Sequence, residues 1–153
     1  MPSDGMSIQE ANKARMRDFV QVVQNQQEVD ACDRFFAKDF VNPDIARVLA
    51  TGEGCSEHFE DHLEGDKVIH RMLFKAFPDL VVTILDMAAE GDKVWTMKRF
   101  QGTHLGPWMD VKPTGRSMCF EVVDVMRMRE GLIVDHQMVS TFEAMVDQLR
   151  RGV

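Results

Sequence analysis

The sequence predicts one α+β domain, with N-terminal helices on one face of an antiparallel sheet. Apolar residues follow a helical spacing as far as Pro78 and a strand-like pattern beyond it. The separators between the later strands are too short for parallel crossovers, which favours hairpins. The chain has 153 residues, enough to bury a hydrophobic core, and we expect a single domain over residues 1–153.

The first helix is predicted at residues 7–24. Ser7 and Glu10 match the capping-box pattern that begins many helices. The apolar residues that follow are spaced by three or four positions: Met16, Phe19, Val20 and Val23. Both features indicate a helix with one buried face.

Two further helices are expected before Pro78. Val29, Cys32 and Phe36 predict a short one, and Pro43 requires the residue before it to leave helical geometry. The next helix must stop near Pro78. Its apolar face repeats the helical spacing with Ile69, Met72, Leu73 and Ala76.

Four strands are predicted after Pro78, because β-branched, aromatic and methionine side chains gather there. They cover residues 80–89, 93–104, 117–129 and 132–139. Short separators that contain glycine join them as an antiparallel meander. Ser140 and Glu143 form a second capping box, and the apolar stripe of a closing helix follows with Phe142, Met145, Val146 and Leu149.

The charge and composition exclude several classes of function. A net charge of −7 with scattered Lys and Arg disfavours nucleic acid. No apolar run approaches the roughly 20 residues of a membrane span, and the first residues lack the features of a secretory signal, so we expect a cytoplasmic protein without membrane contact. The three cysteines, Cys32, Cys55 and Cys119, have no paired spacing, which predicts reduced and mostly buried thiols. The expected partner is a small neutral or apolar molecule.

Asp124 is the first candidate for a functional residue. In residues 117–129 the even positions place six side chains on one face of the strand, and five of them are apolar. The sixth is Asp124, whose charge is costly in such surroundings unless it has a partner. A carboxylate satisfied by backbone donors is the structural alternative, and an acid/base group in a pocket is the functional one.

His136 is the expected partner of Asp124. A two-residue turn would require positive φ at Glu130, which is unfavourable, so a three-residue turn ending at Gly131 is preferred. This register pairs Asp124 with His136 on neighbouring strands. A carboxylate fixes the tautomer of an imidazole and strengthens it as a base, which predicts proton transfer by Asp124 and His136; a structural hydrogen bond is the alternative.

The candidates for substrate binding are Asn42, His104, Trp108, Met126 and Met138. Asn42 can donate to a carbonyl oxygen, or it can cap a turn. His104 and Trp108 flank a long loop, where an aromatic side chain can cover a ligand or fill the core. The two methionines share the inner face with Asp124.

Other chemistries find little support. His58 and His62 share a helix face as metal ligands do, but Glu60 does not follow the H-E-x-x-H order and no third ligand is evident, so no metal is expected. The chain has no Tyr, which excludes a tyrosyl donor. It also lacks the G-x-S-x-G motif of serine hydrolases and a Gly-rich loop for nucleotides.

Several short motifs follow one another in a specific order and spacing: Asn42-Pro43 and residues 76–80, 90–94, 102–106, 112–116 and 127–136. Together they resemble the SnoaL-like polyketide cyclases over most of residues 12–149. The resemblance implies an NTF2-like cone, in which N-terminal helices pack on a highly curved antiparallel sheet around a ligand. It also implies a homodimer or higher homo-oligomer. The implied activity is aldol cyclisation of a polyketide ester without cofactor, with a carboxylate as acid/base.

The polar residues of the expected pocket depart from the pattern of the namesake enzymes. Their acid lies two residues after the histidine of the last strand, which is Met138 here, and a histidine stands where this chain has Asp124. Residues 44–64 form a longer segment than in those enzymes and are expected to be an added lid. We therefore expect Asp124 and His136 to move a proton on an apolar carbonyl compound, in aldol cyclisation or a related isomerisation or hydration, with Asn42 orienting an oxygen.

A non-catalytic ligand-binding or assembly module is the alternative function. In that case Asp124 is a structural acid and methionines fill the cone, whereas a cavity of several hundred Å³, the usual range for ligand sites, that exposes Asp124 and His136 favours the enzyme. The other face of residues 117–129 carries Cys119, Val123 and Val125. Two apolar faces need two covers, which predicts a dimer through the sheets.

Overall fold

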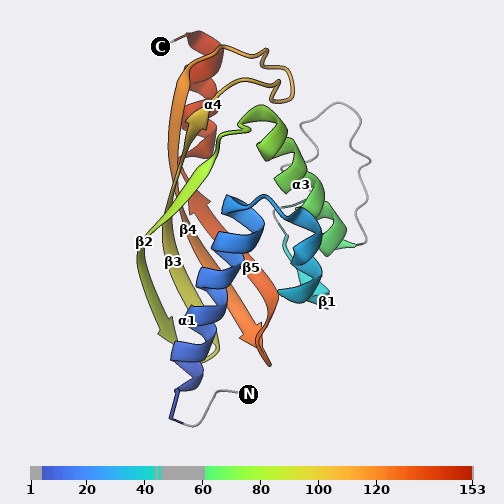
Figure 1. Cartoon of the computed structure of the whole chain (residues 1–153), viewed down its shortest axis with the longest axis vertical. Coiled ribbons are helices and arrows are strands. Elements are labelled where there is room, and N and C mark those ends of the chain that lie inside the picture. The colour runs from blue at the N-terminus through green and yellow to red at the C-terminus, as the bar shows by residue number, and fades with distance from the viewer. Residues whose placement is uncertain (1–4, 44, 46–60, 153) are drawn as a thin grey trace.

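The computed structural model describes residues 5–43, 45 and 61–152 (Figure 1). In chain order the elements are α1 (Ile8–Phe19), η1 (Val20–Asn25), η2 (Val29–Arg34), β1 (Phe36–Val41), α3 (His62–Ala76), β2 (Val81–Glu90), β3 (Lys93–Thr103), β4 (Ser117–Arg129), β5 (Leu132–Ser140) and α4 (Phe142–Arg151). In Figure 1, α1 and α3 lie on one side of the curved sheet. The predicted α+β class, with N-terminal helices on a curved antiparallel sheet, is confirmed.

Within the described residues, five strands form one sheet in the order β1-β5-β4-β3-β2. The strands β2 to β5 pair antiparallel through the predicted hairpins. The sequence does not predict β1, which pairs parallel to β5 with Phe36 beside Ile133. The predicted meander is therefore antiparallel as expected, and β1 adds one parallel pair at its edge. Short separators constrain only strands that follow one another, and most of the domain lies between β1 and β5.

The first and third predicted helices form with side-chain caps. The Ser7 hydroxyl accepts from the Glu10 N–H at 3.2 Å and begins α1, which continues as the π-helix η1. The Asp61 carboxylate accepts from the Glu64 N–H at 3.1 Å and begins α3. In the described part of the chain, no helix is long and apolar enough to cross a membrane.

The second predicted helix is shorter than expected. It is a 3-10 helix that ends at Arg34, and Phe36 belongs to β1 instead. Phe35, Phe36 and Ala37 are all buried, and three successive residues cannot share one face of a helix. The chain therefore leaves helical geometry before Phe36.

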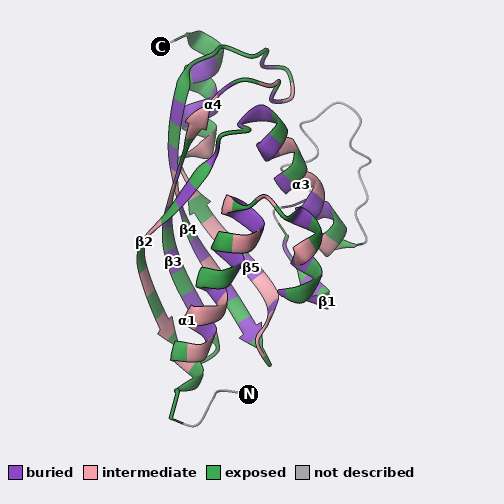
Figure 2. Ribbon diagram, in the orientation of Figure 1, coloured by how far each residue is buried: buried purple, intermediate pink, exposed green. Residues whose placement is uncertain are grey.

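The core lies between the inner face of the sheet and the helices. Figure 2 shows that buried residues alternate with exposed ones along the strands and helices that enclose it. Phe19 of α1 contacts Phe36, with ring centroids 5.4 Å apart. Towards α4, Phe120 lies 4.6 Å from Phe100 and 4.9 Å from Phe142. These two aromatic groups frame a cavity on the inner face of the sheet.

Candidate active site

The inner face of β4 has the predicted alternation. Asp124 is 2% exposed, and the odd positions are exposed or half-buried. The buried apolar residues of this face are Met118, Phe120, Val122, Met126 and Met128. The carboxylate of Asp124 therefore lies inside the core and depends on partners from other elements.

The turn after β4 differs from the prediction. Glu130 and Gly131 have φ values of 51° and 76°, and Arg129 pairs with Leu132 across a two-residue turn. Glu130 thus adopts positive φ, the conformation that was expected to be unfavourable for this residue. The three-residue turn predicted from the sequence is wrong.

A bulge in β5 offsets the shorter turn. Beyond it Met126 lies beside His136, and Asp124 lies beside Met138 rather than beside His136. The extra residue returns His136 to the inner face, because each one-residue shift exchanges the two faces of a strand. The predicted cross-strand pairing of Asp124 with His136 is wrong, but the two side chains meet along the diagonal between the strands.

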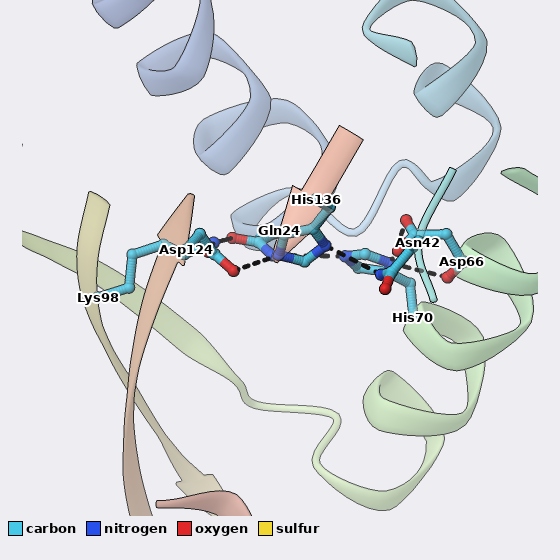
Figure 3. A network of polar contacts seen from close by, with 7 residues as sticks. All are labelled: Gln24, Asn42, Asp66, His70, Lys98, Asp124 and His136. Atoms are coloured by element: carbon cyan, nitrogen blue, oxygen red, sulfur yellow. Dashed lines mark hydrogen bonds and ion pairs between the residues drawn. The ribbon is translucent and has the colours of Figure 1, made fainter. Parts of the chain in front are cut away.

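Asp124, His136 and Asn42 form a hydrogen-bonded series (Figure 3). His136 Nε2 lies 2.6 Å from Asp124 Oδ1, and His136 Nδ1 lies 3.1 Å from Asn42 Nδ2. An ionised Asp124 can only accept, so Nε2 carries the proton and Nδ1 presents its lone pair to the Asn42 amide. This tautomer is the one that a general base requires.

Lys98 is the second partner of Asp124, and the sequence analysis missed it. Its Nζ lies 2.5 Å from Asp124 Oδ2, and the residue is 1% exposed. Burial raises the pKa of Asp124, but the charges and hydrogen bonds of Lys98 and His136 outweigh this effect and hold the pKa well below its usual range. The signal for Lys98 was its place in β3, where Val94, Thr96 and Phe100 share its buried face.

A second group of polar residues continues the network from Lys98 into the helices (Figure 3). Lys98 Nζ donates to Gln24 Oε1 at 3.1 Å, and Gln24 Nε2 lies 3.4 Å from His70 Nε2. His70 Nδ1 lies 2.9 Å from the backbone oxygen of Asp66 and 3.2 Å from its Oδ2. Burial lowers the pKa of His70, but the charge and hydrogen bonds of Asp66 raise it by more, so the pKa is raised overall.

The network borders a mainly apolar cavity of about 130 Å³. Its wall includes Asp124 and His136 together with the predicted ligand-binding residues Asn42, Trp108, Met126 and Met138. His104 lies elsewhere: it is fully buried, its Nδ1 accepts from the Thr114 N–H at 3.2 Å, and its ring packs against Phe77. The structure thus brings four of the five predicted binding residues to the cavity, and gives His104 a place in the core behind it.

His58, one of the two histidines considered and rejected as metal ligands, and most of the lid expected at residues 44–64 lie outside the described residues. His62 begins α3, and its Nδ1 accepts from the Asn42 N–H at 2.9 Å. Cys32 is buried, and burial raises the pKa of its thiol to about 12. Cys119 is exposed, contrary to the expectation of buried thiols, because it lies on the outer face of β4.

The comparisons with known proteins agree with this geometry. The family model of the SnoaL-like polyketide cyclases matches residues 14–149. The chain belongs to this family. The NTF2-like fold that the resemblance implied is confirmed. A search of the curated proteins finds none that matches.

Solved structures resemble the chain over nearly its full length. IdmH of Streptomyces antibioticus, a proposed polyketide cyclase, is 28% identical, with 93% of this chain and 99% of that chain covered and a TM-score of 0.73. AclR of Streptomyces galilaeus, a proposed hydroxylase, is 24% identical, with 92% and 85% covered and a TM-score of 0.73. TsrD of Streptomyces laurentii is 20% identical, with 94% and 98% covered and a TM-score of 0.76.

Proposed function

We propose that this protein catalyses acid/base chemistry, without a cofactor, on a mainly apolar carbonyl compound bound in the cavity. The hydrogen-bonded series Asp124, His136 and Asn42 at the wall of an apolar cavity carries the proposal. Membership of the SnoaL-like family also supports it, as does the cyclase description of IdmH.

His136 is the general base in this proposal. A ligand carbonyl accepts a hydrogen bond from the Asn42 amide, which places the neighbouring C–H group beside His136 Nδ1. Nδ1 takes the proton, the C–H electron pair becomes an enolate, and Asp124 stabilises the imidazolium through Nε2–H. The enolate then attacks a second carbonyl group, which gives cyclisation, or takes a proton at another atom, which gives isomerisation.

The first test is deuterium exchange of a simple ketone. Cyclohexanone in D₂O should exchange its α-hydrogens faster with the protein than without it, as followed by NMR. Asp124→Asn in a Lys98→Met background, which leaves no unpaired buried charge, should lower this rate on the order of 10²-fold or more. Glu121→Gln, on the outer face of the same strand, is the matched control. No exchange by the wild-type protein, or equal rates in all variants, would contradict the proposal.

A non-catalytic ligand-binding module is the second candidate. Both carboxylate oxygens of Asp124 have side-chain partners, Lys98 and His136. Both ring nitrogens of His136 also have partners, Asp124 and Asn42, and such complete pairing favours a structural network. In that case the Asp124 variants would lose stability, and the wild-type protein would bind cyclohexanone without exchanging its hydrogens.

We also propose that the protein is a dimer that pairs through the outer faces of its sheets. Met97, Val123 and Val139 are neighbours across β3, β4 and β5, and they are 37%, 37% and 76% exposed. Trp95, 36% exposed, lies on the same face. A continuous apolar row of this kind on a sheet is typical of a contact surface.

A further inference from the structure

The cavity contains two histidines, and each has a carboxylate at one ring nitrogen and a side-chain amide at the other. His136 of β5 lies between Asp124 and Asn42. His70 of α3 lies between Asp66 and Gln24. Both histidines line the same cavity, one from the sheet and the other from the helices.

Lys98 joins the two arrangements. Its ammonium group bonds Asp124 Oδ2 at 2.5 Å and Gln24 Oε1 at 3.1 Å. An ammonium group only donates, so it requires an acceptor from each neighbour. It therefore keeps Asp124 ionised and keeps the oxygen of the Gln24 amide turned towards itself.

The two histidines differ in the ring nitrogen that can interact with a ligand and in whether that nitrogen can accept or donate a hydrogen bond. At His136, the ionised Asp124 takes Nε2–H, and the lone pair of Nδ1 accepts from the Asn42 amide until a ligand C–H group takes that place. At His70, Asp66 takes Nδ1–H, and the atom that faces Nε2 is the Gln24 amide nitrogen. This nitrogen cannot accept a hydrogen bond, so when His70 is protonated its Nε2–H requires an acceptor from a ligand.

We infer that His70 with Asp66 is a second acid/base pair that acts as the general acid, and that Lys98 sets His70 as the acid and His136 as the base. The inference rests on the proposed function and names its substrate class, a compound with two carbonyl groups. The charged groups around His70 are Asp66 on its own helix, which raises the pKa of His70, and Lys98 from β3, which lowers it.

The reaction balances in one cycle. His136 Nδ1 removes a proton from the carbon beside the first carbonyl, and the electron pair of that C–H bond forms a C–C bond to the second carbonyl carbon. The oxygen of the second carbonyl takes the proton from His70 Nε2 and becomes a hydroxyl group. The proton on His136 then leaves to water, and His70 is reprotonated from water.

The charge-setting role of Lys98 can be tested without any substrate. In protein with ¹⁵N-labelled histidine, NMR should find neutral His136 protonated at Nε2 and neutral His70 protonated at Nδ1. In the Lys98→Met/Asp124→Asn variant, His136 should lose its fixed tautomer, and the titration of His70 should move to higher pH because a nearby positive charge is gone. The opposite tautomer at His70 in the wild type, or an unchanged titration in the variant, would overturn the inference.

Two probe reactions test the separate roles of His136 as the base and His70 as the acid. Deuterium exchange of cyclohexanone needs the base, whereas ring closure of heptane-2,6-dione to 3-hydroxy-3-methylcyclohexanone needs both base and acid. His70→Gln should lower ring closure on the order of 10²-fold and lower exchange far less. Asp66→Asn should change ring closure in the same direction and shift its pH profile. Arg71→Gln, an exposed change on the same helix, is the control.

Each outcome of this test has a separate meaning. Equal losses of exchange and ring closure in His70→Gln, or a similar loss of ring closure in Arg71→Gln, would overturn the role of His70 and leave the proposed function in place. Exchange without ring closure by the wild type would do the same. Neither reaction by the wild type would overturn the proposed function together with this inference.

Discussion

Lys98 and Arg99 are neighbours in β3, and each forms an ion pair with an acid of β4, but on opposite faces of the sheet. The Lys98–Asp124 pair is 2.5 Å long, and its side chains are 2% and 3% exposed. The Arg99–Glu121 pair is 2.8 Å long, and its side chains are 41% and 37% exposed. Water can replace either partner of the outer pair, whereas each member of the inner pair depends on the other. The two ion pairs have similar lengths, but the buried pair should contribute much to stability and the exposed pair little.

Breaking the inner pair should have the largest effect. Lys98→Met leaves the Asp124 charge buried with His136 as its remaining side-chain partner among the described contacts, and we expect the free energy of unfolding to fall by about 3–5 kcal/mol. Denaturant titration measures this change. Lys98→Met/Asp124→Asn should recover most of the loss, because neither charge remains. A double variant as unstable as the single one would show that packing of Lys98, and not its charge, supports the core.

The outer face should matter for association more than for folding. Val139→Lys places a charge in the apolar row with Met97 and Val123, and we expect it to convert the proposed dimer to a monomer in sedimentation velocity at micromolar concentration. Glu90→Lys, at the exposed end of the β2–β3 hairpin, is the control. A monomeric wild-type protein would contradict the expectation directly.

The pH dependence of stability should also distinguish buried pairs from exposed ones. The pKa of His70 is raised in the folded state, so its contribution is fully present below the ordinary value of 6.5 and is lost as the pH rises through the raised value. The free energy of unfolding of the wild type should therefore fall over this pH range. His70→Gln should lack this decrease, because it has no group that titrates at this position. Melting temperatures between pH 6 and 9 measure the difference. Parallel curves for the two proteins would remove His70 as the cause.

The outer ion pair should contribute least. Arg99→Gln removes a solvated partner of Glu121, and the free energy of unfolding should change by less than about 1 kcal/mol. Arg99→Gln/Glu121→Gln should differ little from the single variant. A loss comparable to that of Lys98→Met would mean that burial does not separate the two pairs, and the comparison between the faces would fail.

The sequence predicts the inner face of β4 well, because strict alternation leaves Asp124 as the one charged residue among apolar neighbours. Its contact with His136 is predicted for a wrong reason. The turn is one residue shorter than expected, and the bulge in β5 adds one residue. Each shifts the pairing by one residue in the same direction, so the total shift of two residues moves the pairing but returns His136 to the inner face. Neither the strain that Glu130 accepts nor the position of the bulge is visible in local residue patterns.

Other parts of the site depend on contacts between distant segments. β1 has no clear alternation, since Phe36 and Ala37 are both buried, and its partner β5 lies almost at the other end of the chain. His70 follows Asp66 by one helical turn on α3, a spacing common on exposed helices, and only the tertiary structure places the pair against Gln24. Of these residues, Lys98 alone could have been predicted as a buried residue from the sequence. Its neighbours in β3 alternate between buried and exposed as clearly as those of Asp124 in β4.

The π-helix η1 makes the position of Gln24 depend on chain length. Its hydrogen bonds span one residue more than those of an α-helix, so deletion of a single residue among positions 20–23 would let the segment return to α-helical winding. The deletion removes one residue and changes the winding at the same time, so Gln24 moves along the helix axis and turns relative to α1. The helix would become more regular while Gln24 lost its alignment with Lys98 and His70. A deletion among positions 20–23 should therefore leave the helix more regular but lower the activity that is proposed for the site.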